Sequence, residues 1–165
     1  MISISTTKSN GIAEAITGLS LADTSIKRVF FQSLGRSVSR AKNMVAKEIA
    51  IELKLPIKTI RRRLLMFQQK SSSSQDIKIW AGLNDIPIGY LGKAKQLDDD
   101  VLVKGVKVNN AYISNGLVVL RETKEIATLT IEQKVRDILI QRFPYYFNRE
   151  FEKTFGQLLR YKFNK

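Results

Sequence analysis

The sequence predicts an α+β fold, in which N-terminal helices and a long C-terminal helix lie against an antiparallel β-meander of about four strands. Apolar residues recur at helical spacing in the first part of the chain and again after residue 130, whereas they alternate with period two in between. The middle part also contains Asn115-Gly116, the strongest short signal for a β-hairpin. Helices, then consecutive hairpins, then a further helix are typical of the α+β class.

These patterns divide one predicted domain of 165 residues into five segments. The expected order is residues 1–11 as a flexible arm or short strand, 12–69 as a basic helical part, 70–75 as a Ser-rich linker, 76–129 as the antiparallel sheet and 130–165 as the C-terminal helix. The linker is expected because its consecutive serines give no periodic apolar face.

The first long helix is expected to have two opposite faces. Its apolar stripe, spaced by three or four residues, comprises Phe30, Leu34, Val38, Ala41, Val45 and Ile49. Its basic stripe, spaced by four or seven residues, comprises Arg36, Arg40, Lys47 and Lys54. Two residues separate the stripes, which is roughly 200° around a helix. One face should therefore pack inward, and the other should present positive charge.

Residues 50–67 are expected to form a helix–turn–helix-like pair. Pro56 would end the first helix and begin the second, which would continue to near Phe67. In DNA-binding pairs of this kind the turn favours glycine, because the backbone there needs a positive φ, and this chain has Lys54 at that place. The second helix would carry three consecutive arginines, Arg61–Arg63, near its middle.

The sheet segment is expected to hold four strands joined by turns. One strand begins near Ile77, and residues 101–108 form another, in which Gly105 is interpreted as a bulge that resets the register. Two more strands flank Asn115-Gly116. Residues 96–100 contain three consecutive aspartates and are expected to be an acidic loop tip.

The C-terminal helix is expected to begin with a capping box, because Thr130 and Gln133 have the required spacing. Pro144 is expected to kink the helix or restart it. The predicted buried stripe comprises Ile131, Val135, Ile138, Leu139, Phe147, Phe151, Phe155 and Leu158.

Composition narrows the classes of function. The chain has no cysteine and no histidine, which excludes disulfides, thiol catalysis, thiolate metal sites and the commonest general base. A small enzyme built from carboxylates or lysine is an alternative, but no convergent carboxylate set is visible. Asp98–Asp100 could bind a divalent cation, although the EF-hand spacing is missing and a solvated loop tip is the simpler interpretation. We therefore expect no enzyme activity, no metal and no cofactor.

Neither a secretory signal nor a membrane span is predicted. The N-terminus lacks a charged start followed by an apolar run, and no apolar stretch has the length that a bilayer requires. We expect a protein that stays in the cytoplasm or is packed into a particle assembled there, without a membrane partner.

The charge of the chain is high and unevenly distributed. The net charge is +13, and residues 27–70 hold twelve basic residues against two acidic ones. Such an excess indicates a polyanionic partner, although a solvated helix face is the alternative. Three consecutive arginines spread over roughly 200° of a helix, so they suit phosphates better than base edges. The residues expected to face DNA or a partner are Arg36, Arg40, Lys47, Lys54, Lys58, Arg61, Arg62 and Arg63.

The segment "RAKNMVAKEIAIELKLPIKTIRRRL" (40–64) resembles the signature of the minor tail protein Z family of tailed phages. That signature has a basic helix of the type R-A-x-x-x-V-A-K-E, a Leu-Pro turn and then I-R-x-R. The matching positions here are Arg40, Ala41, Val45, Ala46, Lys47, Glu48, Leu55, Pro56, Ile60, Arg61 and Arg63. The later order of "IWAGL", "VKGVKV", a hairpin, "VVLRE" and a Thr-Ile helix start is also similar, so the resemblance extends from about residue 28 onward.

The resemblance implies a structural virion protein that completes the tail at its head-proximal end. Its fold should be similar to those of tail terminator and tail completion proteins, which form six-fold rings around the DNA channel. The implied partners are further copies of the chain in a hexameric ring, other neck and tail proteins (tail terminator, tail tube and head-completion proteins) and packaged DNA in non-specific contact. The protein would be assembled in the host cytoplasm and reside in the virion. The alternative is a helix-turn-helix DNA-binding regulator that uses residues 40–67.

Overall fold

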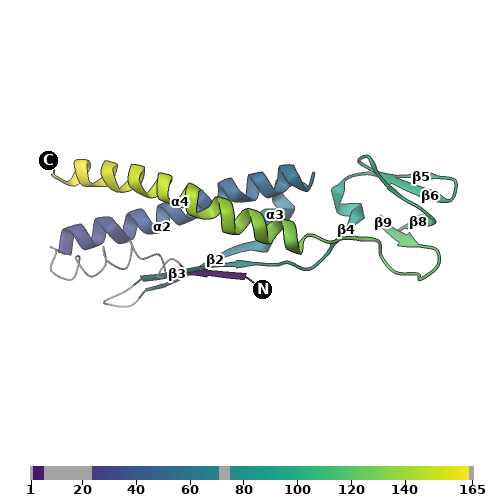
Figure 1. Cartoon of the computed structure of the whole chain (residues 1–165), viewed down its shortest axis with the longest axis horizontal. Coiled ribbons are helices and arrows are strands. Elements are labelled where there is room, and N and C mark those ends of the chain that lie inside the picture. Colours follow the sequence, from purple (N-terminus) through teal and green to yellow (C-terminus); the bar gives the residue numbers. More distant parts are fainter. Residues whose placement is uncertain (1, 6–23, 71–74, 164–165) are drawn as a thin grey trace.

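The computed structural model describes residues 2–5, 24–70 and 75–163. It is a mixed helix and sheet structure with antiparallel strands and a long C-terminal helix, as expected for an α+β protein. Figure 1 shows an elongated molecule, in which the long helices α2 (Thr24–Glu52) and α4 (Glu132–Phe163) run side by side in opposite directions. A sheet lies along this pair, and a smaller group of strands lies beyond one end of it.

Helix α2 buries the predicted apolar stripe. Val38, Ala41, Val45 and Ile49 are completely buried, and Leu34 is nearly so, because three- and four-residue steps place them on one side of the helix. Helix α4 packs along α2, and its phenylalanines meet those of α2 near the C-terminus. Burial of these two stripes against each other and against the sheet is the main source of the core.

The turn after α2 closes the helix with a left-handed residue. The amide of Leu55 donates to the carbonyl of Ala50 at 2.9 Å, and the amide of Lys54 donates to the carbonyl of Ile51 at 3.1 Å. These two bonds are those of a Schellman cap, with Lys54 at the left-handed position and a φ of 54°. The predicted positive φ at this turn residue is confirmed. Pro56 then begins α3 (Ile57–Arg63).

The prediction that α3 continues to Phe67 is wrong. The helix ends at Arg63, and residues that were expected to extend it form strand β2 (Leu64–Lys70). β2 pairs antiparallel with β3 (Gln75–Ala81), which also pairs with β1 (Ile2–Ser5). Of the expected linker over residues 70–75, Lys70 and Gln75 belong to the paired strands instead. The apolar run "LLMF" fits the period of a strand as well as that of a helix, and pairing with β3 makes it a strand here.

Several predictions fall on residues outside the described ranges. They are the arm or strand over residues 6–11, the start of the helical part at residue 12, and the four serines 71–74.

The chain leaves and re-enters the helical half of the molecule through two paired strands, which we call the neck. β4 (Ile86–Pro87) pairs antiparallel with β10 (Thr128–Leu129), and the amide of Ile88 donates to the carbonyl of Ala127 at 2.9 Å. The 3-10 helix η2 (Ile88–Leu91) follows β4. It packs so tightly that a Cβ on Gly89 would lie 2.8 Å from the carbonyl oxygen of Gly116.

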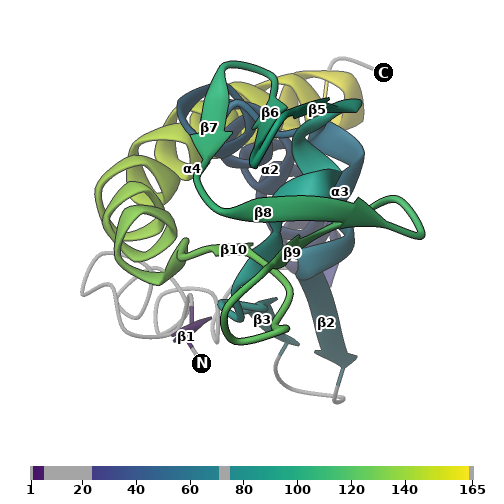
Figure 2. The same ribbon diagram turned by 90° about the vertical axis from the view of Figure 1, so that its right-hand side faces the viewer.

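The strands beyond the neck, residues 94–120, form a unit that we call the β module (Figure 2). It has a three-stranded sheet and a two-stranded hairpin, each antiparallel. The strands are β5 (Ala94–Leu97), β6 (Asp100–Val103), β7 (Val106–Val108), β8 (Ala111–Ser114) and β9 (Leu117–Leu120). The expected single meander is thus replaced by several small sheets.

Turn chemistry in the β module is partly as predicted. Asn115-Gly116 forms the β8–β9 hairpin turn, with φ values of 50° and 77°. Gly105 is not a bulge, because Lys104-Gly105 forms the tight turn between β6 and β7 with φ values of 47° and 84°. The change of valine parity across Gly105 therefore marks a reversal of the chain rather than an extra residue in one strand.

The start and middle of α4 also differ from expectation. The helix begins at Glu132, and the Thr130 hydroxyl lies 3.3 Å from Oδ2 of Asp85 instead of capping the helix. Pro144 lies inside one helix that continues to Phe163, so it does not restart the helix. Pro144 is exposed, and its neighbours Phe143 and Phe147 hold the helix against the core.

Candidate basic interface

The exposed face of α2 carries uncompensated positive charge. Arg36 and Lys47 are exposed on the side opposite the apolar stripe, as predicted. The two acidic residues of α2 lie on its other flank, against α4: Glu48 accepts from Arg142 at 3.0 Å, and Glu52 lies 3.9 Å from Lys134. Because α4 neutralises both carboxylates of α2, none is left to neutralise the basic face.

Helix α3 adds further exposed cations. Lys58, Arg61 and Arg62 are exposed, and none of the three forms an ion pair with a residue that the structure describes. The arginines lie in the last turn of a seven-residue helix, where cations are favourable near the free carbonyl groups. They are therefore not at the helix start, which is the part that a recognition helix inserts into a groove.

Two of the predicted interface residues have structural contacts. Arg40 lies 3.5 Å from the carboxylate of Glu150 and donates to the Thr154 hydroxyl at 3.2 Å, so it joins α2 to α4. Arg63 turns back to the loop after β3 and donates to the carbonyl groups of Asn84 and Asp85. Their guanidinium groups are thus engaged within the chain, and the interface depends on the other six predicted residues.

A groove at the end of α2 includes residues that the sequence did not suggest. It has a volume of about 470 Å³ and is lined by Lys47, Ala50, Ile51, Lys54, Leu55, Ile57 and Lys104. Ile51 is 78% exposed, and it could have been singled out because it lies two residues past Ile49, off the buried stripe. Lys104 comes from the β6–β7 turn, and its ammonium donates to the carbonyl of Lys54 at 3.0 Å. Only the folded chain brings these residues together.

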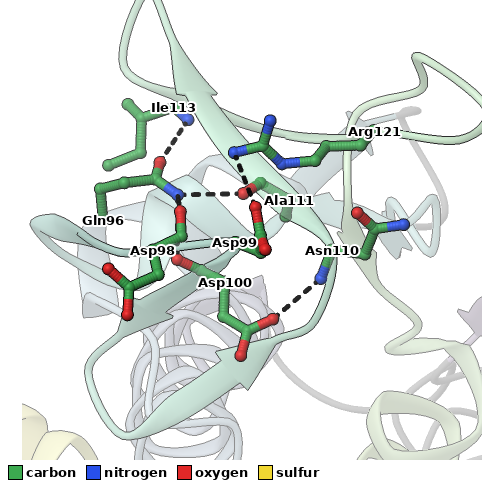
Figure 3. Close-up of polar contacts among 8 residues, drawn as sticks. All are labelled: Gln96, Asp98, Asp99, Asp100, Asn110, Ala111, Ile113 and Arg121. Carbon is green, nitrogen blue, oxygen red and sulfur yellow. Dashed lines mark hydrogen bonds and ion pairs between the residues drawn. The ribbon is translucent and has the colours of Figure 1, made fainter.

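Side-chain hydrogen bonds hold the acidic turn between β5 and β6 (Figure 3). The side-chain amide of Gln96 donates to the carbonyl groups of Asp98, Asp100 and Ala111 at 3.0–3.1 Å. Its oxygen accepts from the amide of Ile113 at 3.2 Å. This glutamine therefore fixes the turn and joins it to β8.

The three aspartates of this turn have different surroundings. Asp100 lies 2.8 Å from the ammonium of Lys107, and the Lys107 hydrogen bond, followed by the amide of Asn110, lowers the pKa of Asp100. Asp99 lies 3.7 Å from Arg121, with its side chain 89% exposed. The carboxylate of Asp98 points away from the other labelled residues in Figure 3. Within the described residues no group of three or more acidic side chains is arranged to hold a metal ion.

A further polar cluster joins the two long helices. The Tyr146 hydroxyl donates to Glu48 at 3.0 Å, and this hydrogen bond is the main reason that the pKa of Tyr146 is raised. Arg149 lies over the Tyr145 and Tyr146 rings, at 5.8 and 5.5 Å from their centres. These contacts are satisfied within the chain, so the cluster stabilises the helix pair.

Comparisons with known proteins give no relative from which a function could be transferred. No family model, no curated protein and no solved structure matches this chain. None of the helices in the described ranges combines the length and apolarity that crossing a membrane requires.

Proposed function

We propose that the protein is a structural phage protein, a subunit of a homo-oligomeric ring at the head-proximal end of the tail, whose basic face lies toward packaged DNA. One observation carries this proposal: Arg36 and Lys47 of α2 and three cations of α3 are exposed without an ion pair among the described residues, while both carboxylates of α2 pair with α4. A face with this charge attracts phosphates without reading a base sequence. The resemblance of residues 40–64 to the tail protein Z family supports the same role.

The geometry of α3 favours phosphate contact over base reading. A recognition helix has to project its first turns into the major groove. Here the second helix has seven residues, its arginines lie in the last turn, and Arg63 is already bound to backbone carbonyl groups. Diffuse positive charge also suits a channel, because a tight and specific grip would obstruct the passage of DNA.

Exposed apolar side chains support a role as an assembled subunit. Phe67 of β2 is 55% exposed, and Ile140 and Tyr145, both on α4, are 57% and 58% exposed. Phe67 belongs to β2, which is an edge strand of its sheet among the described residues. In an assembled ring, neighbouring subunits would cover such side chains.

The alternative function, a helix-turn-helix regulator that uses residues 40–67, has one observation in its favour: the left-handed turn at Lys54 between two helices. This alternative predicts that the protein protects a defined DNA site in a footprinting experiment. Its affinity for that site should be far above its affinity for random DNA at the same salt concentration.

The first prediction concerns the salt dependence of DNA binding. The variant Arg36→Gln, Arg61→Gln, Arg62→Gln should bind random-sequence duplex DNA more weakly, because three phosphate contacts are lost. The slope of log K against log salt should decrease by roughly 2 to 3 units. Fluorescence anisotropy at several salt concentrations measures both quantities. The matched control is Lys93→Gln, Lys153→Gln, Arg160→Gln, which removes the same charge from other exposed positions.

The proposal as a whole has a separate test. The purified protein should self-associate in analytical ultracentrifugation, and intact virions should contain it in mass spectra. A protein that is monomeric at all concentrations and absent from virions contradicts the proposal. Equal loss of DNA affinity in the two triple variants would show that overall charge, rather than the face of α2 and α3, governs binding.

A further inference from the structure

The groove at the end of α2 differs in chemistry from the rest of the basic face. Its lining combines apolar residues, among them the exposed Ile51, with Lys47, Lys54 and Lys104. None of the residues that line it is acidic. A phosphate backbone offers no apolar group to cover an isoleucine. The groove instead matches a peptide segment that carries an apolar side chain next to carboxylates.

The β5–β6 turn of the same chain has this chemistry. Leu97 is 36% exposed and is followed directly by Asp98 and Asp99, whose side chains reach solvent. The Asp99 side chain is 89% exposed, and its carboxylate lies 3.7 Å from the guanidinium of Arg121, which makes this a long ion pair. Because Gln96 already fixes the backbone of the turn, little conformational freedom remains to be lost on docking. We call residues 97–99 the acidic tip.

We propose that the acidic tip of one copy of this chain docks in the groove of a second copy, with Leu97 over Ile51 and the aspartates beside Lys47 and Lys54. This inference rests on the proposed ring and names the contact between its subunits. The division of the basic face follows from it: Arg36, Arg61 and Arg62 face phosphates, whereas Lys47 and Lys54 face a neighbour.

The contact cannot form within one chain. Lys104 lines the groove from the turn at one end of β6 (Asp100–Val103), and the acidic tip lies at the other end of the same strand. The strand therefore separates tip and groove in each copy. A tip that enters the groove of another copy leaves its own groove free for a third, which makes the association head-to-tail. Such contacts close into a ring where the rotation between copies permits it.

The second prediction tests this contact by charge exchange. The tip variant Asp98→Lys, Asp99→Lys and the groove variant Lys47→Glu, Lys54→Glu should each weaken self-association at least tenfold, because like charges then meet. An equal mixture of the two should recover association, because each tip then finds a groove of opposite charge. Sedimentation velocity over a range of concentrations measures the effect. Matched controls are Glu125→Lys, Glu152→Lys and Lys93→Glu, Lys153→Glu, which should leave association unchanged.

The outcomes separate this inference from the proposed function. Self-association that neither variant alters contradicts tip-in-groove docking but leaves the ring in place. A wild-type protein that is monomeric throughout contradicts both. A groove variant that loses affinity for random DNA while it associates normally shows that the groove binds phosphates, which also contradicts the docking.

Because the chain contains no cysteine, the same contact can be trapped directly. The variant Ile51→Cys, Leu97→Cys should form intermolecular disulfides on mild oxidation, seen as a ladder of bands on a non-reducing gel. The control Ile51→Cys, Ile126→Cys uses another exposed apolar position and should remain monomeric on the gel. A ladder in both variants would contradict a specific contact, and so would its absence in the first when that protein is folded and self-associated.

Discussion

Lys54 shows at the scale of one residue how the α2–α3 turn is stabilised despite an unfavourable side chain. A side chain at a φ of 54° costs free energy that glycine does not pay, since glycine has no Cβ. The third prediction is that Lys54→Gly raises the free energy of unfolding by about 0.5–1 kcal/mol. Urea denaturation at low protein concentration measures this. Lys58→Gly is the contrasting control: inside α3 the same change should lower stability by about 1 kcal/mol.

Asp100 makes stability depend on acidity. Its pKa is held below 3.8 by Lys107 and by the amide of Asn110. For a carboxyl with a lowered folded pKa, the stabilisation is complete above the unfolded value and is lost as pH falls through the folded value. The fourth prediction is therefore that Asp100→Asn has a shallower loss of stability below about pH 4 than the wild type. Denaturant unfolding at several pH values measures the slope. Asp98→Asn, in the same turn but outside this ion pair, is the matched control for the loss of one carboxylate.

At the scale of elements, α2 contains two buried serines with different surroundings. The Ser33 hydroxyl donates to the carbonyl of Val29 at 2.7 Å, whereas the Ser37 hydroxyl has no partner among the described residues. A buried hydroxyl without a hydrogen bond destabilises the fold, and alanine also favours the helix. The fifth prediction is that Ser37→Ala stabilises the protein by about 1 kcal/mol and that Ser33→Ala stabilises it less. Thermal unfolding of both variants in parallel tests this prediction. Equal shifts of the unfolding temperature in the two variants would contradict it.

Elements with one clear period could be predicted from the sequence, and ambiguous ones could not. The α2 stripe and the Asn115-Gly116 hairpin were correct, because local spacing alone defines them. Residues 64–67 were wrongly expected to be helical, because a run of apolar residues fits either period and only pairing with β3 decides between them. Gly105 could be interpreted as a bulge or a turn until its neighbours in the sheet were known.

For the whole molecule, the sequence shows which residues are basic, but it does not predict which of them are engaged in contacts within the chain. Arg36 and Arg40 lie about one helical turn apart in α2. Of the two, only Arg40 pairs with Glu150 of α4, which is more than a hundred positions away in the sequence. The groove depended on the same kind of distant contact, because Lys104 joins Lys47 and Lys54 only in the folded chain. Periodicity locates a residue on a helix, and tertiary packing decides what stands opposite it.

The neck has a consequence for the symmetry of any assembly. The groove belongs mainly to the helical half and the acidic tip to the β module, and the chain passes between these two parts through β4 and β10. If copies associate tip to groove as proposed above, the inclination of one part to the other at this pair of short strands would set the angle between successive copies. A small change in that angle, accumulated around a circle, alters how many copies close it, or opens the circle into a helix. Ile86 and Leu129, which pair across the neck, would then govern the curvature of the assembly without touching another subunit.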